Sequence, residues 1–209
     1  MRCDNVYKSF VLIGEMGSGK DEFAKLLPSF SRVAFSDEIR LVVKNLRING
    51  VQQAYWQLYN LYGQRPPNGL IDKLNELRAI PQLNTKDRRL LQELGTYCRS
   101  KDKFIWIRKV LDNISKDKKY IVTDCRRKSE LDACVALGFI PIFIEADMDI
   151  RRQRLIDRDG SYDEITFYHE AEQEIRDLKK YCTWVVANNG ALEELEGCVD
   201  IIVTAEELK

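Results

Sequence analysis

The sequence has little of what most metal sites and histidine-dependent catalysts require. It contains one histidine and six cysteines, and no two cysteines have the C-x-x-C spacing. A structural zinc site usually takes closely spaced Cys and His ligands, so none is expected. We interpret the cysteines as small core residues with free thiols, and His169 as structural rather than catalytic.

An excess of charge of one sign is also absent, because 33 basic residues balance 33 acidic ones. A neutral chain has no long-range field that favours nucleic acid or a membrane surface, so neither is expected as a partner. The opening "MRCDNVYKSFVLIG" contains an apolar run too short for a signal peptide or a membrane span. These features predict a reduced, cytoplasmic location.

Short apolar runs alternate with helical patterns along the chain, which predicts an α/β fold with a mainly parallel sheet and helices on both faces. A helical block interrupts this alternation. We expect a single domain over residues 1–209, with a core of residues 1–36 and 117–209 and an inserted helical subdomain of about 37–116. Strands are predicted at residues 9–14, 31–36, 119–125, 139–146 and 182–188.

The stretch "GEMGSGKD" fits the phosphate-loop pattern G-x-x-x-x-G-K, with Gly14, Gly19 and Lys20 at its fixed positions. It follows a predicted strand and precedes a predicted helix, as the pattern requires. We expect the main-chain amides of this loop, including those of Gly17 and Ser18, to surround the phosphates of ATP. Lys20 is expected to hold the β- and γ-phosphates.

Two carboxylates are candidate magnesium ligands. Asp21 follows the loop lysine, where most such loops carry a hydroxyl that ligates Mg²⁺. It can ligate the metal directly or through water, or act locally by stabilising the helix N-terminus, and both alternatives remain open. Asp124 ends a predicted strand and can ligate Mg²⁺ through water or bind a sugar hydroxyl.

Phosphoryl transfer depends on cations around the donor and acceptor phosphates. Arg126 lies just past a core strand, at the sheet edge where open α/β folds bind ligands. In "RRQRLIDRDG", arginines at i, i+3 and i+7 share one helical face and predict a lid of about 147–165 that excludes water. Arg154 and Arg158 are its strongest catalytic candidates. The arginine clusters are Arg40; Arg88 and Arg89; Arg126 and Arg127; and Arg151, Arg152, Arg154 and Arg158.

The ordered segments "GEMGSGKDEFA", "FSDEIR", "RRLLQELGTYCR", "IVTDCRRKSELD" and "ANNGALEEL" resemble those of the phage-type deoxynucleoside monophosphate kinases. These enzymes belong to the P-loop nucleotide kinase superfamily. The resemblance implies a three-layer α/β/α fold with a five-stranded parallel sheet, a helical acceptor-binding insertion and a lid. It also implies Mg-ATP-dependent transfer of the γ-phosphoryl group to a small-molecule nucleoside monophosphate.

The same resemblance implies roles for individual residues on the acceptor side. Arg89 and Arg126 would grip the acceptor phosphate, and Gln92 would read the base edge or the sugar. Asp37 and Arg40, in the segment "FSDEIR", would face the acceptor site. Ala171 stands where the family has a serine.

Other functions remain open. "TDCRRKSE" and the S-G-K-D loop also resemble animal-type phosphomevalonate kinases. The acceptor can therefore be another phosphorylated small molecule, such as phosphomevalonate or dephospho-coenzyme A, or the chain can bind nucleotide without turnover. The aromatic run Tyr55, Trp56, Tyr59 and Tyr62 favours a nucleotide, because flat rings stack on bases, although this spacing also suits core packing. The oligomeric state is open, with a homodimer as one alternative.

Overall fold

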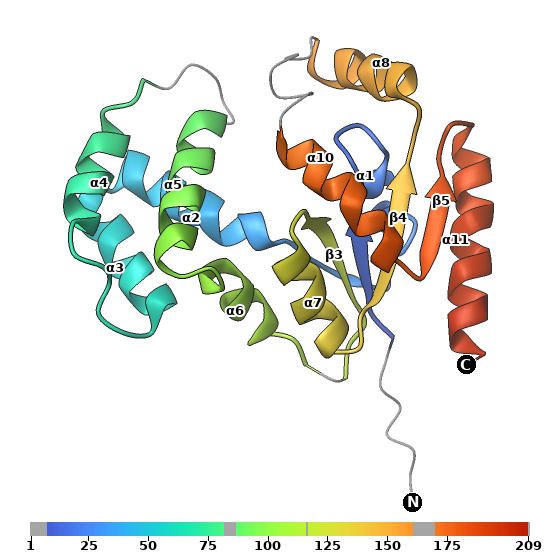
Figure 1. Ribbon diagram of the computed structural model, residues 1–209, viewed down its shortest axis with the longest axis horizontal. Helices are drawn as coiled ribbons and strands as arrows, with labels where there is room; N and C mark the ends of the chain where they lie inside the picture. Colours follow the sequence, from blue (N-terminus) through green and yellow to red (C-terminus); the bar gives the residue numbers. More distant parts are fainter. Residues whose placement is uncertain (1–7, 82–86, 116, 161–169, 209) are drawn as a thin grey trace, which may run out of the picture. The chain divides into compact units, whose positions relative to one another are not determined.

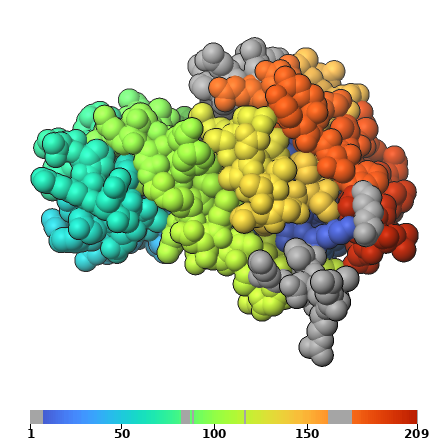
Figure 2. Space-filling model, turned by 60° about the horizontal axis from the view of Figure 1, so that its bottom comes forward, coloured from blue at the N-terminus to red at the C-terminus, as the bar shows by residue number. Residues whose placement is uncertain are grey.

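The computed structural model describes residues 8–81, 87–115, 117–160 and 170–208 (Figure 1). The chain divides into two compact units, one of residues 1–34 with 114–209 and one of residues 35–113. Figure 2 shows how the first unit combines the two ends of the sequence: blue atoms from the N-terminal part are visible between yellow and red segments from the C-terminal part.

The first unit contains a five-stranded parallel sheet with the order β2-β3-β1-β4-β5. Phe10 of the central strand lies opposite Ile121 on one side and Ile140 on the other. The predicted α/β architecture with a parallel sheet is confirmed. The strands are β1 (Phe10–Ile13), β2 (Ser31–Val33), β3 (Tyr120–Cys125), β4 (Ile140–Glu145) and β5 (Trp184–Ala187).

Helices cover both faces of this sheet, which gives the predicted three layers. Phe10 and Leu12 point to one face, where they pack with Phe23 of α1 and Leu195 of α11. On the other face α7 and the short helix η1 contact β4 (Figure 1). The bounds are α1 (Lys20–Lys25), α7 (Lys128–Ala136), α8 (Met148–Asp159), α10 (Glu170–Asp177), η1 (Leu178–Tyr181) and α11 (Leu192–Glu207).

The second unit is entirely helical in its described residues. Its helices share one apolar core, to which α2 contributes Val42 and Leu46, and α3, α4 and α5 contribute Leu58, Leu74 and Leu94. The helices are α2 (Phe35–Ile48), α3 (Val51–Tyr62), α4 (Leu70–Arg78), α5 (Arg88–Lys101) and α6 (Ile105–Leu111). No helix in the described part of the chain combines the length and apolarity that crossing a bilayer requires.

Several element boundaries differ from the sequence prediction, and the difference is largest at the end of the second strand. The second strand ends at Val33 rather than residue 36, and α2 begins at Phe35 rather than at residue 37. Phe35 is buried one helical turn before Ile39, so the apolar stripe already starts there. The last helix runs from Leu192 to Glu207, and its buried residues continue along the face that packs on the sheet.

The cysteines of the described chain are free, as expected. Cys98, Cys125 and Cys134 are buried, and burial raises the pKa of the Cys98 thiol to about 12. A buried, protonated thiol is a poor nucleophile, so these residues act as core side chains. Cys3 lies outside the described residues.

One charged pair joins three helices of the second unit. The Asp87 carboxylate accepts hydrogen bonds from Arg47 Nε at 2.7 Å and Arg47 Nη2 at 3.0 Å, and Arg47 Nη1 donates to the Arg78 carbonyl at 3.0 Å. Asp87 has a left-handed backbone, with φ 44°. The hydrogen bond to Asp87 raises the pKa of Arg47, so the pair links α2, the end of α4 and the start of α5 as ions.

We expect Asp87→Asn to lower the free energy of unfolding by about 3 kcal/mol, because it leaves the largely buried Arg47 guanidinium without its carboxylate. Asparagine tolerates the left-handed backbone, so the change isolates the charge. Urea unfolding followed by circular dichroism measures the effect. The matched control, Asp72→Asn on the exposed face of α4, should change stability by less than about 0.5 kcal/mol. Equal stabilities of the two variants would contradict this account.

Candidate functional site

The phosphate loop connects β1 to α1 and is packed so closely that its glycines cannot carry side chains. Gly17 and Gly19 have φ angles of 80° and 100°, in the left-handed region that favours glycine. A Cβ on Gly17 would lie 2.7 Å from the carbonyl oxygen of Arg151, and one on Gly19 would overlap the amide nitrogen of Asn188. The glycines at these positions are therefore required by both the backbone conformation and the neighbours.

Lys20, the first residue of α1, places its ammonium group over this loop. Its Nζ donates to the carbonyl oxygens of Gly14 at 2.6 Å and Glu15 at 2.9 Å, and lies 3.5 Å from the hydroxyl of buried Ser18. The positive charge is thus held within the loop whose amides are expected to surround phosphates. Because the N-terminus of α1 adds a partial positive charge, the loop is suited to an anion.

The residue that follows β5, Asn188, contacts both the phosphate loop and the predicted lid helix. Asn188 Nδ2 donates to the Ser18 carbonyl at 2.8 Å, and Arg154 Nη1 donates to the Asn188 carbonyl at 2.9 Å. The same Arg154 nitrogen lies 3.9 Å from the position that a Cβ on Gly19 would occupy. Arg154, predicted from the sequence, is therefore next to the phosphate loop.

Arg158, the second predicted lid arginine, is also close to the loop helix. Its Nε and Nη2 donate to the Asp159 carboxylate at 3.1 and 2.7 Å. The pKa of Arg158 is raised, first by this hydrogen bond and to a smaller extent by the charge of Asp21. Asp21 is exposed in the first turn of α1, and its charge is partly balanced by Arg158.

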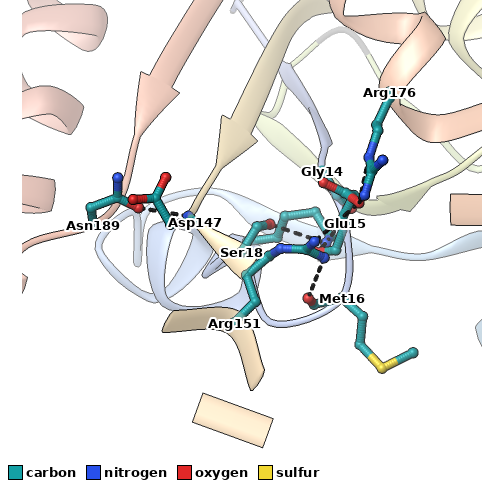
Figure 3. Close-up of polar contacts among 9 residues, drawn as sticks. Gly14, Glu15, Met16, Ser18, Asp147, Arg151, Arg176 and Asn189 are labelled. Carbon is teal, nitrogen blue, oxygen red and sulfur yellow. Dashed lines mark hydrogen bonds and ion pairs between the residues drawn. The ribbon is translucent and has the colours of Figure 1, made fainter. Parts of the chain in front are cut away.

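A cluster that the sequence did not predict surrounds Glu15 (Figure 3). One oxygen of the Glu15 carboxylate lies 2.8 Å from both Nε and Nη2 of Arg176 and 3.2 Å from Nη2 of Arg151. Arg151 is only 2% exposed and also donates to the Met16 carbonyl at 3.3 Å. Arg151 shares the lid segment with Arg154, but it is a buried part of the loop's support.

A cavity of about 420 Å³ lies beside this cluster, at the carboxyl ends of β4 and β5. In open α/β sheets ligands bind at this edge. Within it Lys179 pairs with Glu145 at 2.6 Å, and the Asp147 amide donates to the Asn189 side chain at 2.8 Å. The cavity is lined by Glu15, Phe143, Glu145, Ala146, Asp147, Arg176, Lys179, Ala187 and Asn189.

The end of β3 carries the predicted Asp124 and Arg126. The main-chain amides of Arg126 and Arg127 donate to one oxygen of the Glu130 carboxylate at 2.8 and 3.1 Å, which fixes the turn into α7. Asp124 is half-buried and the Arg126 side chain is exposed. Asp124 is the penultimate residue of β3 and Arg126 directly follows the strand, and their roles in binding stay predictions.

The remaining predicted acceptor residues belong to the second unit. Asp37 pairs with Arg40 on α2 at 3.0 Å, and Arg89 pairs with Glu93 on α5 at 3.0 Å. Exposed pairs of this kind contribute about 0–1 kcal/mol, so an anion can compete for the guanidinium groups. Gln92 is exposed on α5, which begins at Arg88. His169 and the predicted lid residues 161–165 lie outside the described residues.

The aromatic run on α3 separates into two roles. Tyr62 is buried in the helical core, and burial raises its pKa strongly, so it is a core residue. Trp56 and Tyr59 are 50% and 38% exposed, with their rings edge to face at 5.4 Å. These two rings are available for stacking, whereas Tyr62 is not.

No group of three or more His, Cys, Asp or Glu side chains arranged for a metal occurs among the residues that the structure describes. Kinase magnesium sites usually combine one or two carboxylates with phosphate oxygens and waters. Asp21 and Asp124 supply ligands of that type, and their assignment as ligands stays a prediction.

A family model described as deoxynucleotide monophosphate kinase matches residues 70–199, a range that does not include the phosphate loop. The structure is similar to the crystal structure of TT1252 from Thermus thermophilus, with 20% identity, 95% and 98% of the two chains covered and a TM-score of 0.52.

Two further structures show weaker likeness. The dephospho-CoA kinase from Campylobacter jejuni has 14% identity, coverage of 95% and 96%, and a TM-score of 0.48. A gluconokinase from Sinorhizobium meliloti 1021 has 13% identity, 97% of each chain covered and a TM-score of 0.47. The search of curated proteins found no significant match.

We expect Gly19→Ala to weaken binding of a non-hydrolysable ATP analogue by about tenfold or more, because the new Cβ overlaps Asn188 and the backbone is left-handed. Isothermal titration calorimetry measures the affinity. The control Gly197→Ala adds a methyl group to α11 where nothing lies within 4 Å. It should leave binding unchanged and stabilise the fold by roughly 0.5–1 kcal/mol. Analogue affinity of wild-type strength in Gly19→Ala would refute the proposed loop geometry.

Proposed function

We propose that this chain, which belongs to the deoxynucleotide monophosphate kinase family, transfers the γ-phosphoryl group of Mg-ATP to a (deoxy)nucleoside monophosphate. The observation that carries the proposal is the phosphate loop with Lys20 folded over it and Arg154 beside it. The loop lies at residues 14–20 and the family match covers residues 70–199. The loop and the family match therefore support the proposal from separate parts of the chain.

The donor side needs positive charge that is already in place, because phosphoryl transfer is catalysed mainly by positioning and charge neutralisation. In this proposal the loop amides from Gly14 to Lys20 and the Lys20 ammonium bind the β- and γ-phosphates. Arg154 and Arg158 neutralise the charge that develops during transfer. Arg158 partly offsets the negative charge of Asp21, which makes a carboxylate tolerable next to the phosphates.

Magnesium, when bound, would neutralise part of the charge of the phosphates. Asp21 is exposed at the start of α1, and Asp124 is half-buried at the end of β3. Both are hard oxygen donors, which suits this metal. We propose them as the protein's contribution to its coordination.

For the acceptor side we propose Arg126 at the sheet edge and, in the helical unit, Asp37, Arg40, Arg89 and Gln92. Three of these residues are arginines, which suits recognition of a phosphate by paired hydrogen bonds. An acceptor phosphate oxygen is already ionised at neutral pH, so the mechanism requires no general base. The exposed rings of Trp56 and Tyr59 support an acceptor that carries a base.

Lys20→Ala is expected to lower kcat/KM by on the order of a thousandfold while the fold stays intact, because the transferring phosphates lose their fixed cation. ADP release in a coupled assay and circular dichroism give the two readouts. Lys25→Ala, at the other end of α1, removes an exposed lysine that pairs with Glu22 and should retain activity. Full activity in Lys20→Ala would exclude the assignment.

Arg126→Ala is expected to raise the acceptor KM or lower kcat, with little change in ATP affinity, because Arg126 is assigned to the acceptor phosphate. Steady-state kinetics with each substrate varied in turn separates these effects. Arg127→Ala is the neighbouring control, since Arg127 lies 4.0 Å from Glu174 in a weak exposed pair. Loss of ATP affinity with unchanged acceptor kinetics would place Arg126 on the donor side.

The acceptor is identified by ADP release against a panel of ribo- and deoxyribonucleoside monophosphates, with phosphomevalonate and dephospho-coenzyme A included. The proposal expects turnover with at least one nucleoside monophosphate and none with the other two compounds. Turnover of either non-nucleotide substrate in preference would replace the proposed acceptor. ATP binding with no turnover of any of them would favour a binding module.

A further inference from the structure

A carboxylate inside a phosphate loop requires an explanation. Glu15 directly follows Gly14, and the residue is only 8% exposed, so its charge is not turned out into water. A negative charge at this position opposes the binding of a polyphosphate, and burying it without partners would destabilise the fold. The contacts of Glu15 must therefore offset both effects.

Two arginines from two different helices converge on Glu15 (Figure 3). Arg151 lies in the first turns of α8, within the predicted lid of residues 147–165, and Arg176 lies in α10, which follows it in the sequence. Both bind the same carboxylate oxygen, at 3.2 Å from Arg151 Nη2 and 2.8 Å from Arg176 Nε. One loop residue thus links the phosphate loop to both helices.

The two arginines differ in burial. The Arg151 side chain is 2% exposed and also donates to the Met16 carbonyl, so it is a fixed part of the loop. Arg154, one helical turn later, donates to Asn188 beside Gly19. The orientation of Arg154 therefore depends on how α8 is fixed at Arg151. The Arg176 side chain is 58% exposed, so its pair with Glu15 is weak and exchangeable.

We propose that Glu15 is a positioning residue: its carboxylate fixes Arg151, and through α8 fixes Arg154 at the donor phosphates, while it holds Arg176 ready beside the loop. This inference rests on the proposed kinase function. One carboxylate and two guanidinium groups leave a net positive charge, so the cluster attracts a polyphosphate despite containing Glu15. Because Glu15 accepts bonds from two guanidinium groups, it is not suited to act as a general base.

The net positive charge of the cluster makes the positioning role of Glu15 distinguishable by experiment. Glu15→Gln keeps the size of the side chain and an acceptor oxygen, but it removes the negative charge. Coulomb attraction for a triphosphate should then stay the same or increase. Arg151 and Arg176 lose their charged partner, and misplacing catalytic groups lowers the rate of transfer. Turnover and nucleotide affinity should therefore change in opposite directions.

The test compares Glu15→Gln with Glu15→Asp and with the control Glu22→Gln, an exposed carboxylate of α1 that pairs with Lys25 at 2.7 Å. We expect Glu15→Gln to lower kcat by roughly tenfold to a hundredfold. Its affinity for a non-hydrolysable ATP analogue, measured by calorimetry, should be unchanged or higher. Glu15→Asp keeps the charge and should recover part of kcat, and Glu22→Gln should match the wild type.

A double-variant cycle tests whether Glu15 acts through Arg176 as well as through Arg151. If the Glu15–Arg176 pair contributes, Glu15→Gln combined with Arg176→Gln should lower kcat by less than the product of the two single effects. Independent, multiplicative effects would remove Arg176 from the proposal and leave Arg151 as the group through which Glu15 acts.

An unchanged kcat in Glu15→Gln would overturn the inference. A parallel loss of kcat and of analogue affinity would also overturn it, because that is the result expected if Glu15 only stabilises the structure. If Glu15→Gln does not fold, the same comparison is made with Glu15→Asp: a lower kcat with unchanged analogue affinity supports the inference, and a parallel loss of both contradicts it. If the wild type turns over no acceptor, the proposed function fails. The calorimetric arm then decides about Glu15, because weaker analogue binding by a folded Glu15→Gln variant contradicts the charge balance.

Discussion

Close packing around the phosphate loop is the constraint on which the donor site depends. Side-chain atoms cannot be added at Gly14, Gly17 or Gly19 without overlapping or crowding β4, α8 or the end of β5. The loop is therefore held by three elements that are distant in sequence, and its amides do not need to be ordered when a ligand binds. Preorganisation of this kind is what electrostatic catalysis requires, because reorganisation then costs little during the reaction.

The packing also determines which charges reach the loop. Asn188, directly after β5, donates to the Ser18 carbonyl of the loop and accepts a hydrogen bond from Arg154, so one residue contacts both the loop backbone and a cation. Glu15 of the loop similarly contacts a cation of α8, because its carboxylate pairs with Arg151. The loop, the sheet edge and the predicted lid helix are thus connected by short polar contacts rather than by apolar packing alone.

The sequence predicted the parallel sheet and the phosphate loop because both leave local signals: apolar runs that alternate with helical stripes, and glycines at fixed spacing before a lysine. It also led to the prediction of Arg154 as a lid residue, since arginines on one helical face are visible in the sequence, and its catalytic role stays a prediction. Glu15 and Arg176 could not be found in this way. Positions between the fixed glycines accept many residue types, and an arginine in a charged helix usually faces solvent.

Boundaries and burial were predicted less well, for a related reason. The start of α2 at Phe35 depends on which side chains the helical core accepts, and a strand pattern and a helix pattern look alike over so few residues. Arg151 has the spacing of a lid residue, yet its place in the first turns of α8 brings it against Met16 and buries it. Only tertiary contacts distinguish it from Arg154.

Burial separates the arginines of this protein into two classes. Arg151 and Arg47 pair with Glu15 and Asp87 in largely buried sites, where loss of the carboxylate is costly, so these pairs support the structure. Three of the arginines nominated for phosphates pair with carboxylates at exposed positions, where the pair contributes little and a phosphate can replace the carboxylate at small cost. These exchangeable pairs are Arg40–Asp37, Arg89–Glu93 and Arg158–Asp159, and the exposed Arg176 of the Glu15 cluster shares their character. A kinase site that must bind two anionic substrates and release two anionic products benefits from such cations, because the paired carboxylate can take the place of a phosphate that leaves.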